Sequence, residues 1–546
     1  MKISKLRYRP FQILLVTVLV IFGCTEGNSG FLDPDTSDVL DRYKVFTDSV
    51  YTYRYQSRLY GHLIPTYFAD GGMNGASYLS WSGMTDDCIN KNGRTSPGFN
   101  MNEIVDASNS NMRNHWQNCY EGISRINILL KNIEISPLTA QTKTTLKAEA
   151  RLIRAWLYFH LLRLYGGVPL VGDYVFKVSD KVDIPRASFE RVVDYITREC
   201  DELAQVLPEW QGGREYGRLT SGAALAIKSR VLLFAASPLS NGKVPQVSDE
   251  LKPLLGYETY DVNRWKLAAD AAKAVIDLNR YELITDNSKP GLAFYKMQTL
   301  RVNKEYIFSV MKAKNRYPEE VLLPDSRGGK TALSPFQNLV DVFLMDNGLA
   351  ITAPNSGYNP QKPYENREPR FYSTILYQGS LWIPQSNSST PQAISFLYGK
   401  EPDGLGTGGG TLTGYACRKL CDEEVTASQG DSDKILPIIR LGEIYLNYVE
   451  ALNEYDPTNK AEIEKYLIAI RKRAGIKPGV GGRYGLPVSY TQEQMRELIQ
   501  QERRIELAFE EGHRFFDLKR WEKLEEVKNN VDFYGIKWTF SESNEL

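Results

Sequence analysis

Apolar residues recur at three- and four-residue spacing from about residue 110 to residue 280, which predicts amphipathic helices. The clearest stretch is 146–164, which Gly166 and Gly167 end and Pro169 prevents from continuing. We expect further helices at 116–130, 188–207, 221–236 and 263–278. Paired helices with small residues at their contacts indicate a tetratricopeptide-like array. The strict 34-residue consensus does not recur, so a generic helical array stays an alternative.

Residues 281–430 lose this periodicity and are rich in Gly, Pro, Ser, Asn and aromatic side chains. Short β-like pieces occur at 306–310 and 371–377. Long segments with little regular structure are usually functional or disordered, and the aromatic content argues against disorder. We therefore interpret 281–430 as an ordered loop region.

Helical periodicity returns toward the C-terminus, where we expect helices at 438–454, 460–474 and 492–511. A capping box formed by Thr491 and Gln494 begins the last of these. Its many Arg and Glu residues could suggest a catalytic carboxylate pair. Because they lie along a helix with a packed apolar side, we predict instead that Arg–carboxylate pairs join neighbouring helices.

The first residues of the chain change how its charge is understood. The whole chain holds 66 Lys and Arg against 66 Asp and Glu, and four of the basic residues lie within residues 2–9. An uncharged run at 11–23 follows, so residues 1–23 have the pattern of a signal peptide. Its removal leaves an excess of acidic residues, which takes away the electrostatic support for nucleic-acid binding.

Cys24 directly follows Ile21-Phe22-Gly23, which resembles a bacterial lipobox. In lipoproteins this thiol is diacylated, and two or more acyl chains anchor a protein stably to a membrane. We predict lipidation of Cys24 and a flexible polar tether at 24–40. The acidic residues near the start of the tether resemble the surface-export signal of Bacteroidetes lipoproteins. The alternative is a plain secretory signal with a chance cysteine.

Catalytic and metal-binding patterns are sparse. The remaining cysteines are odd in number and the four histidines lack zinc-ligand spacing, so we expect neither a disulfide scaffold, nor a metal site, nor a cofactor. Residues 404–409 fit the GxGxxG pattern without a preceding strand or a following helix, which indicates a flexible loop. Paired glycosidase carboxylates are recognised by their separation in space, so a glycosidase stays an alternative to our expectation of a non-enzyme.

Two loop segments, at 78–102 and 358–387, combine aromatic rings with polar side chains. A sugar ring stacks its C–H face on an aromatic ring, and its hydroxyls need donors and acceptors. A simpler interpretation of each ring is packing against the scaffold. The candidate ligand residues are Trp81, Asp87, Asn90, Asn92, Arg94, Phe99, Tyr358, Tyr364 and Trp382.

Several blocks of the sequence resemble the SusD/RagB family of outer-membrane nutrient-binding lipoproteins of Bacteroidetes. They are found in the expected order at 148–170, 217–236, 368–371, 440–453, 470–475 and 502–518. The resemblance extends from about residue 31 to the C-terminus. It implies a mainly α-helical, tetratricopeptide-like domain with long irregular ligand-binding loops and a few short strands. Within that domain, 41–546, we distinguish a helical repeat part at 41–280, a loop-rich part at 281–430 and C-terminal helices at 431–546.

The resemblance also implies a function. Proteins of this family capture oligosaccharides or polysaccharides at the cell surface and pass them to a SusC-like TonB-dependent transporter, whereas the RagB branch takes peptides. We therefore expect a glycan-binding lipoprotein of the outer membrane that faces the outside of the cell and does not transform its ligand. A peptide ligand and a purely structural surface role stay open alternatives.

Overall fold

The computed structural model of the protein describes residues 42–64, 81–91, 110–177, 179–385, 390–425 and 430–539. The predicted signal peptide, Cys24 and tether lie outside these ranges. Within them, no helix combines the length and the hydrophobicity needed to span a bilayer.

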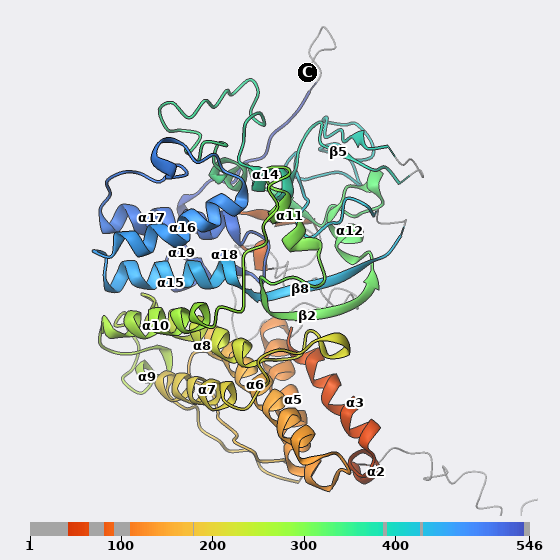
Figure 1. Ribbon diagram of the computed structural model, residues 1–546, viewed down its shortest axis with the longest axis vertical. Helices are drawn as coiled ribbons and strands as arrows, with labels where there is room; N and C mark the ends of the chain where they lie inside the picture. The colour runs from red at the N-terminus through yellow and green to blue at the C-terminus, as the bar shows by residue number, and fades with distance from the viewer. Residues whose placement is uncertain are drawn as a thin grey trace, which may run out of the picture.

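The main helices pack in a continuous series that begins at the lower middle of the molecule and rises along its left side in Figure 1. Each helix from α5 to α10 contacts the next long helix in the chain, α10 contacts α15, and α15 contacts both α16 and α17. The series confirms the helices expected from periodicity. Its members are α5 (Ser110–Asn132), α6 (Ala140–Tyr165), α7 (Phe189–Ala204), α8 (Ser221–Ala236), α10 (Asn263–Asp277), α15 (Leu441–Tyr455), α16 (Lys460–Ala474) and α17 (Gln492–Glu506).

Local sequence signals set the ends of these helices. Ser188 and Thr220 cap α7 and α8, because the side chain of each accepts the backbone N–H of the third residue of its helix. The capping box of Thr491 and Gln494 is present at the start of α17. Helix α6 ends at Gly166, whose φ of 74° suits glycine and whose Cβ, if present, would lie 2.1 Å from the carbonyl oxygen of Leu254.

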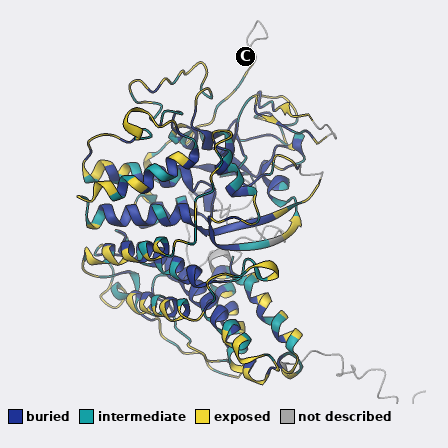
Figure 2. Ribbon diagram, viewed as in Figure 1, coloured by how far each residue is buried: buried dark blue, intermediate teal, exposed yellow. Residues whose placement is uncertain are grey.

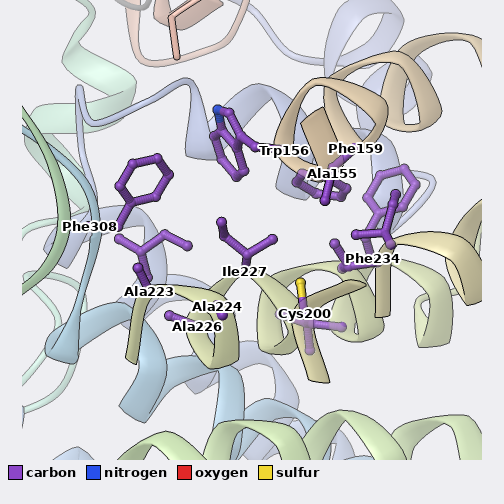
Figure 3. Packing of buried hydrophobic residues seen from close by; sticks show 14 of the residues in the cluster. Ala155, Trp156, Phe159, Cys200, Ala223, Ala224, Ala226, Ile227, Phe234 and Phe308 are labelled. Carbon is purple, nitrogen blue, oxygen red and sulfur yellow. The ribbon is translucent and has the colours of Figure 1, made fainter. Parts of the chain in front are cut away.

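Apolar side chains from the facing sides of the series form the larger core (Figures 2 and 3). Trp156 of α6 lies at its centre, edge-on to Phe308 with ring centroids 5.4 Å apart, and its Nε1 donates to the carbonyl oxygen of Leu63 at 2.8 Å. Small residues such as Ala223 of α8 let the helices approach closely. Shorter helices complete this half of the molecule: α2 (Arg42–Thr47), α3 (Ser49–Leu59) and α9 (Lys252–Leu255).

The loop-rich part is inserted between α10 and α15, two helices that pack against each other (Figure 1). The long antiparallel pair of β2 (Tyr306–Asn315) and β8 (Ser432–Arg440) brings the two ends of this insertion together, because Tyr306 lies opposite Arg440. The insertion has its own apolar core. It contains α11 (Leu292–Thr299), α12 (Tyr317–Leu322), α13 (Gln337–Val342), α14 (Pro369–Thr374) and the short strands β3 (Leu333–Pro335), β4 (Ile375–Leu376), β5 (Leu381–Trp382), β6 (Gln392–Ala393) and β7 (Ala416–Cys417).

Three sequence expectations were wrong in detail. The β-like piece at 371–377 is mostly helix α14, which Pro369 starts at its first position, and only Ile375–Leu376 form a strand. Residues 438–440 belong to β8 rather than to a helix. The helix expected to reach residue 511 stops at Glu506, because Phe509, Glu511 and Gly512 have positive φ. A new helix, α18 (His513–Arg520), follows, and then α19 (Leu524–Asn530).

Buried ion pairs join the loop-rich part to the helical series. Arg440 donates to Glu510 at 2.7 Å, to Glu305 at 2.8 Å and to Glu506 at 2.7 Å. Arg370 of α14 reaches Glu506 and Glu502 of α17 at 2.8 and 2.7 Å. All of these side chains are almost completely buried. The prediction that Arg–carboxylate pairs join the helices is confirmed.

Replacing Arg440 by Met should lower the free energy of unfolding by about 3–5 kcal/mol, because three buried carboxylates lose a cation. The matched control is Lys304→Met, which breaks the exposed Lys304–Glu282 pair and should cost less than about 1 kcal/mol. Urea denaturation of both variants measures the difference. Equal losses would show that the Arg440 pairs contribute no more than a surface salt bridge.

The same network predicts acid sensitivity. Burial disfavours the charged form of Glu506, yet Arg473, Arg440 and Arg370 more than offset this and hold its pKa below the ordinary value. The stabilisation is therefore complete above the unfolded-state pKa of about 4.3 and is lost as pH falls from there toward the lower folded-state pKa. Thermal unfolding between pH 6 and pH 3 should show a falling Tm. Glu506→Gln should start from a lower Tm at pH 6 and lose less of it on acidification, and a slope as steep as that of the parent chain would contradict this explanation.

Candidate ligand-binding face

The first candidate segment is held against the C-terminal helices by its own side chains. Trp81 is 1% exposed and packs its ring 4.6 Å from Phe515 and 5.1 Å from Phe516 between centroids. Asp87 is buried and accepts from Arg504 Nε at 2.7 Å. Asn90 is also buried, in β1 (Cys88–Asn90). These three side chains face the interior, so in this structure they offer no surface to a ligand.

Of the remaining candidates in that segment, Asn92, Arg94 and Phe99 lie outside the described residues. In the second segment, Trp382 is buried in β5, with the guanidinium of Arg418 5.1 Å from its ring centroid. It supports the loop rather than presenting a free ring. Tyr358 and Tyr364, in contrast, are only half-buried.

The two candidate segments are linked through β3 and the residues that follow it. Strand β1 pairs antiparallel with β3, and the N–H of Phe336 donates to the carbonyl oxygen of Asp87 at 2.9 Å. From there a chain of hydrogen bonds leads to the second segment. Tyr415 donates to Gln337 Oε1 at 2.7 Å, and Tyr364 donates to the hydroxyl oxygen of Tyr415 at 3.1 Å.

The C-terminal segment 531–539 adds aromatic rings that the sequence analysis missed. Its backbone is fixed along the loop-rich part at three points: Gln337 N–H donates to Tyr534 O at 2.8 Å, Ile536 N–H to Thr413 O at 2.7 Å, and Tyr398 N–H to Trp538 O at 2.8 Å. Figure 1 shows this segment rising between the loops around α14 and β5. The close spacing of Phe533, Tyr534 and Trp538 after the last helix was the available signal.

These rings and their aromatic neighbours lie along the C-terminal segment and the loops bonded to it, and we name the set the aromatic loop face. Tyr398 and Tyr534 are each 55% exposed. Phe533 stacks on Phe336 with centroids 5.1 Å apart and planes 19° apart. The ring centroids of Trp538 and Tyr364 lie 6.1 Å apart. The members of the face are Phe336, Tyr358, Tyr364, Tyr398, Phe533, Tyr534 and Trp538.

Polar groups surround these rings. Asn338 accepts from the N–H of Tyr534 at 3.0 Å and donates to Asp532 O at 2.8 Å, so it fixes the position of the exposed tyrosine. Asp341 is exposed and accepts from Gln337 Nε2 at 2.7 Å, which leaves it further acceptor capacity. The Lys537 ammonium lies 3.9 Å from the centroid of the Tyr398 ring. Rings bordered by acceptors and donors suit the two surfaces of a sugar.

Tyr358, Tyr364 and Tyr534 stay protonated at neutral pH. Burial raises the pKa of Tyr364 to about 12 and also raises the pKa of Tyr358. The hydrogen bond to Asp532 raises the pKa of Tyr534. These hydroxyls are therefore neutral donors. Among the described residues, no three His, Cys, Asp or Glu side chains converge to hold a metal ion.

Comparison with known families decides which family the fold represents. The model of the SusD family matches residues 294–542, and a family described as starch-binding and associating with the outer membrane matches residues 74–233. The chain belongs to the SusD/RagB family.

Its relatives share the fold along most of their length. A SusD-like protein from Bacteroides ovatus is 24% identical over 446 residues, which are 80% of this chain and 70% of the relative. The structure of a SusD-like protein from Bacteroides fragilis has a TM-score of 0.72 at 26% identity and covers 92% of this chain and 91% of its own. A SusD-like carbohydrate-binding protein from the same species has a TM-score of 0.69 at 22% identity, with 88% of each chain covered.

Trp81→Ala tests whether this ring supports the SusD-like fold. We expect a loss of about 3–5 kcal/mol in the free energy of unfolding, because the change leaves a cavity beside Phe515 and Phe516. Tyr398→Ala, on the aromatic loop face, should change stability by no more than about 0.5 kcal/mol. Chemical denaturation measures both. A Trp81→Ala protein as stable as the parent chain would contradict the structural role.

Proposed function

We propose that the protein captures glycans at the cell surface on the aromatic loop face and delivers them to a SusC-like TonB-dependent transporter. Family membership supports glycan binding and association with the outer membrane, since one matching family is described by these two properties. The exposed rings of Tyr398, Phe533 and Tyr534 on a hydrogen-bonded backbone are the observation that carries the proposal.

Rigidity makes this face suitable for capture. The exposed rings occupy backbone positions that are tied to neighbouring segments at Gln337, Thr413 and Tyr398. Because little backbone freedom is left to lose, more of the stacking energy remains as affinity. An extended row of rings also suits a polymer, whose successive sugars can engage successive rings.

The proposal includes a lipid anchor at Cys24 after removal of residues 1–23. The described chain begins at α2, and Figure 1 places α2 at the opposite end of the molecule from α14 and β5, beside which the aromatic loop face lies. A tether that joins the chain near α2 would leave this face away from the point of attachment. The arrangement supports capture of polymers from the medium.

The ligand is bound rather than transformed in this proposal. Glycosidases need two carboxyl groups on opposite sides of the scissile bond. Asp341 and Asp532 lie beside the rings, and each accepts a side-chain hydrogen bond, from Gln337 and from Tyr534. The proposal assigns to this face stacking and hydrogen bonding rather than catalysis.

Tyr398→Ala and Tyr534→Ala should each weaken glycan binding by roughly five- to tenfold, because each removes one exposed stacking ring. The control is Tyr43→Ala in α2, which removes a ring that is 70% exposed and lies at the far end of the molecule. Calorimetry and affinity electrophoresis with starch, laminarin and xylan measure binding, and chromatography of each mixture detects products.

Each outcome is informative. Glycan affinity that is unchanged in both variants would remove the aromatic loop face from the proposal. Saturable binding of peptides but of none of the glycans, lost in the same variants, would favour the RagB-like function. New saccharide products would indicate a glycosidase.

A further inference from the structure

A cleft opens in the helical series, away from the loop-rich part. Its volume is about 440 Å³, and it lies between the end of α8, the start of α10, and α15 and α17. Three aromatic side chains line it: Tyr260, Trp265 and Trp521. Clefts of roughly 300–1,000 Å³ with apolar walls and a few polar groups are the usual form of small-molecule sites.

Tyr260 is an exposed ring on a fixed support. Its side chain is 62% exposed, while the loop that carries it is bound to the end of α8 by Asn241. The Asn241 side chain accepts from Asp261 N–H at 2.9 Å and donates to Asp261 O at 3.0 Å and to Ala236 O at 3.1 Å. Gly242 lets the two segments meet, since a Cβ there would lie 2.4 Å from Tyr260 N. The backbone that carries Tyr260 is thus fixed in position, while its ring stays exposed to solvent.

The polar lining has no net charge. It holds Glu450, Glu454 and Glu493 against Lys243, Arg496 and Lys523. Arg496 donates to both oxygens of Glu454 at 2.6 Å, and Lys523 donates to Gln500 at 2.7 Å. Glu450 accepts from Arg520 and from the Trp521 indole N–H at 2.8 Å. Because the lining holds equal numbers of acidic and basic side chains, its formal charge would not favour an anion or a cation over a neutral ligand.

We propose that this cleft binds a short neutral saccharide, one or two sugar units long, as a carbohydrate site separate from the aromatic loop face. Tyr260 supplies the stacking ring. The Glu454–Arg496 pair and Gln500 supply acceptors and donors for the hydroxyls. The inference rests on the proposed function only in the class of ligand, since the two sites share no residue.

The test uses the whole chain and a panel of neutral sugars: glucose, galactose, mannose, maltose, cellobiose and laminaribiose. Saturation-transfer NMR identifies the sugars that bind, and calorimetry measures their affinity. We expect saturable binding of at least one sugar, reduced roughly tenfold or more by Tyr260→Ala. Tyr455→Ala, which removes an exposed ring on α15 that does not line the cleft, should leave it unchanged.

The outcomes separate this inference from the proposed function. If polysaccharides bind through Tyr398 and Tyr534 while no small sugar depends on Tyr260, the cleft proposal is overturned and the proposed function stands. If a small sugar binds through Tyr260 while no polysaccharide binds, the cleft proposal stands and the proposed function is overturned. Small-sugar binding that is lost in Tyr534→Ala and kept in Tyr260→Ala also overturns the cleft proposal.

Discussion

Arg440 stands where β8 ends and α15 begins, and its guanidinium binds three carboxylates from two distant parts of the chain. Glu305 precedes β2 at the entrance of the insertion, Glu506 ends α17, and Glu510 lies in the turn before α18. A buried charge is tolerated only with partners in good geometry, so the three segments are held in one arrangement around it. The position of the loop-rich part relative to the helices follows from this constraint.

Other ion pairs help to explain why some aromatic residues support the fold and others face the solvent. The Arg504–Asp87 and Arg514–Asp86 ion pairs bind segment 81–91 to α17 and α18. Trp81 is therefore held inside a small apolar core. The C-terminal segment is bound through its backbone instead. Its side chains therefore stay available at the surface, where Tyr534 can take part in binding.

The two proposed carbohydrate sites use the same physical arrangement on different supports. In each, a backbone is fixed by amide hydrogen bonds, from Asn338 in one and from Asn241 in the other, and holds an exposed tyrosine ring beside polar groups. Fixing the support before the ligand arrives lowers the entropy lost on binding. The rings thus provide affinity without a deep pocket, which suits ligands whose hydroxyls must stay partly hydrated.

Local features of the sequence determined the helices, because periodicity, capping residues and Gly or Pro ends act within a few neighbouring positions. Ser188, Thr491 and Gly166 mark boundaries that the structure confirms. Only the tertiary structure decided which rings are exposed. Trp81 lies between two serines and is buried, whereas Tyr534 follows Phe533 and is exposed. Their burial depends on partners more than 400 and almost 200 residues away. Contacts at such distances leave no periodic signal, so the candidate site could be placed in the loops but not assigned to its residues.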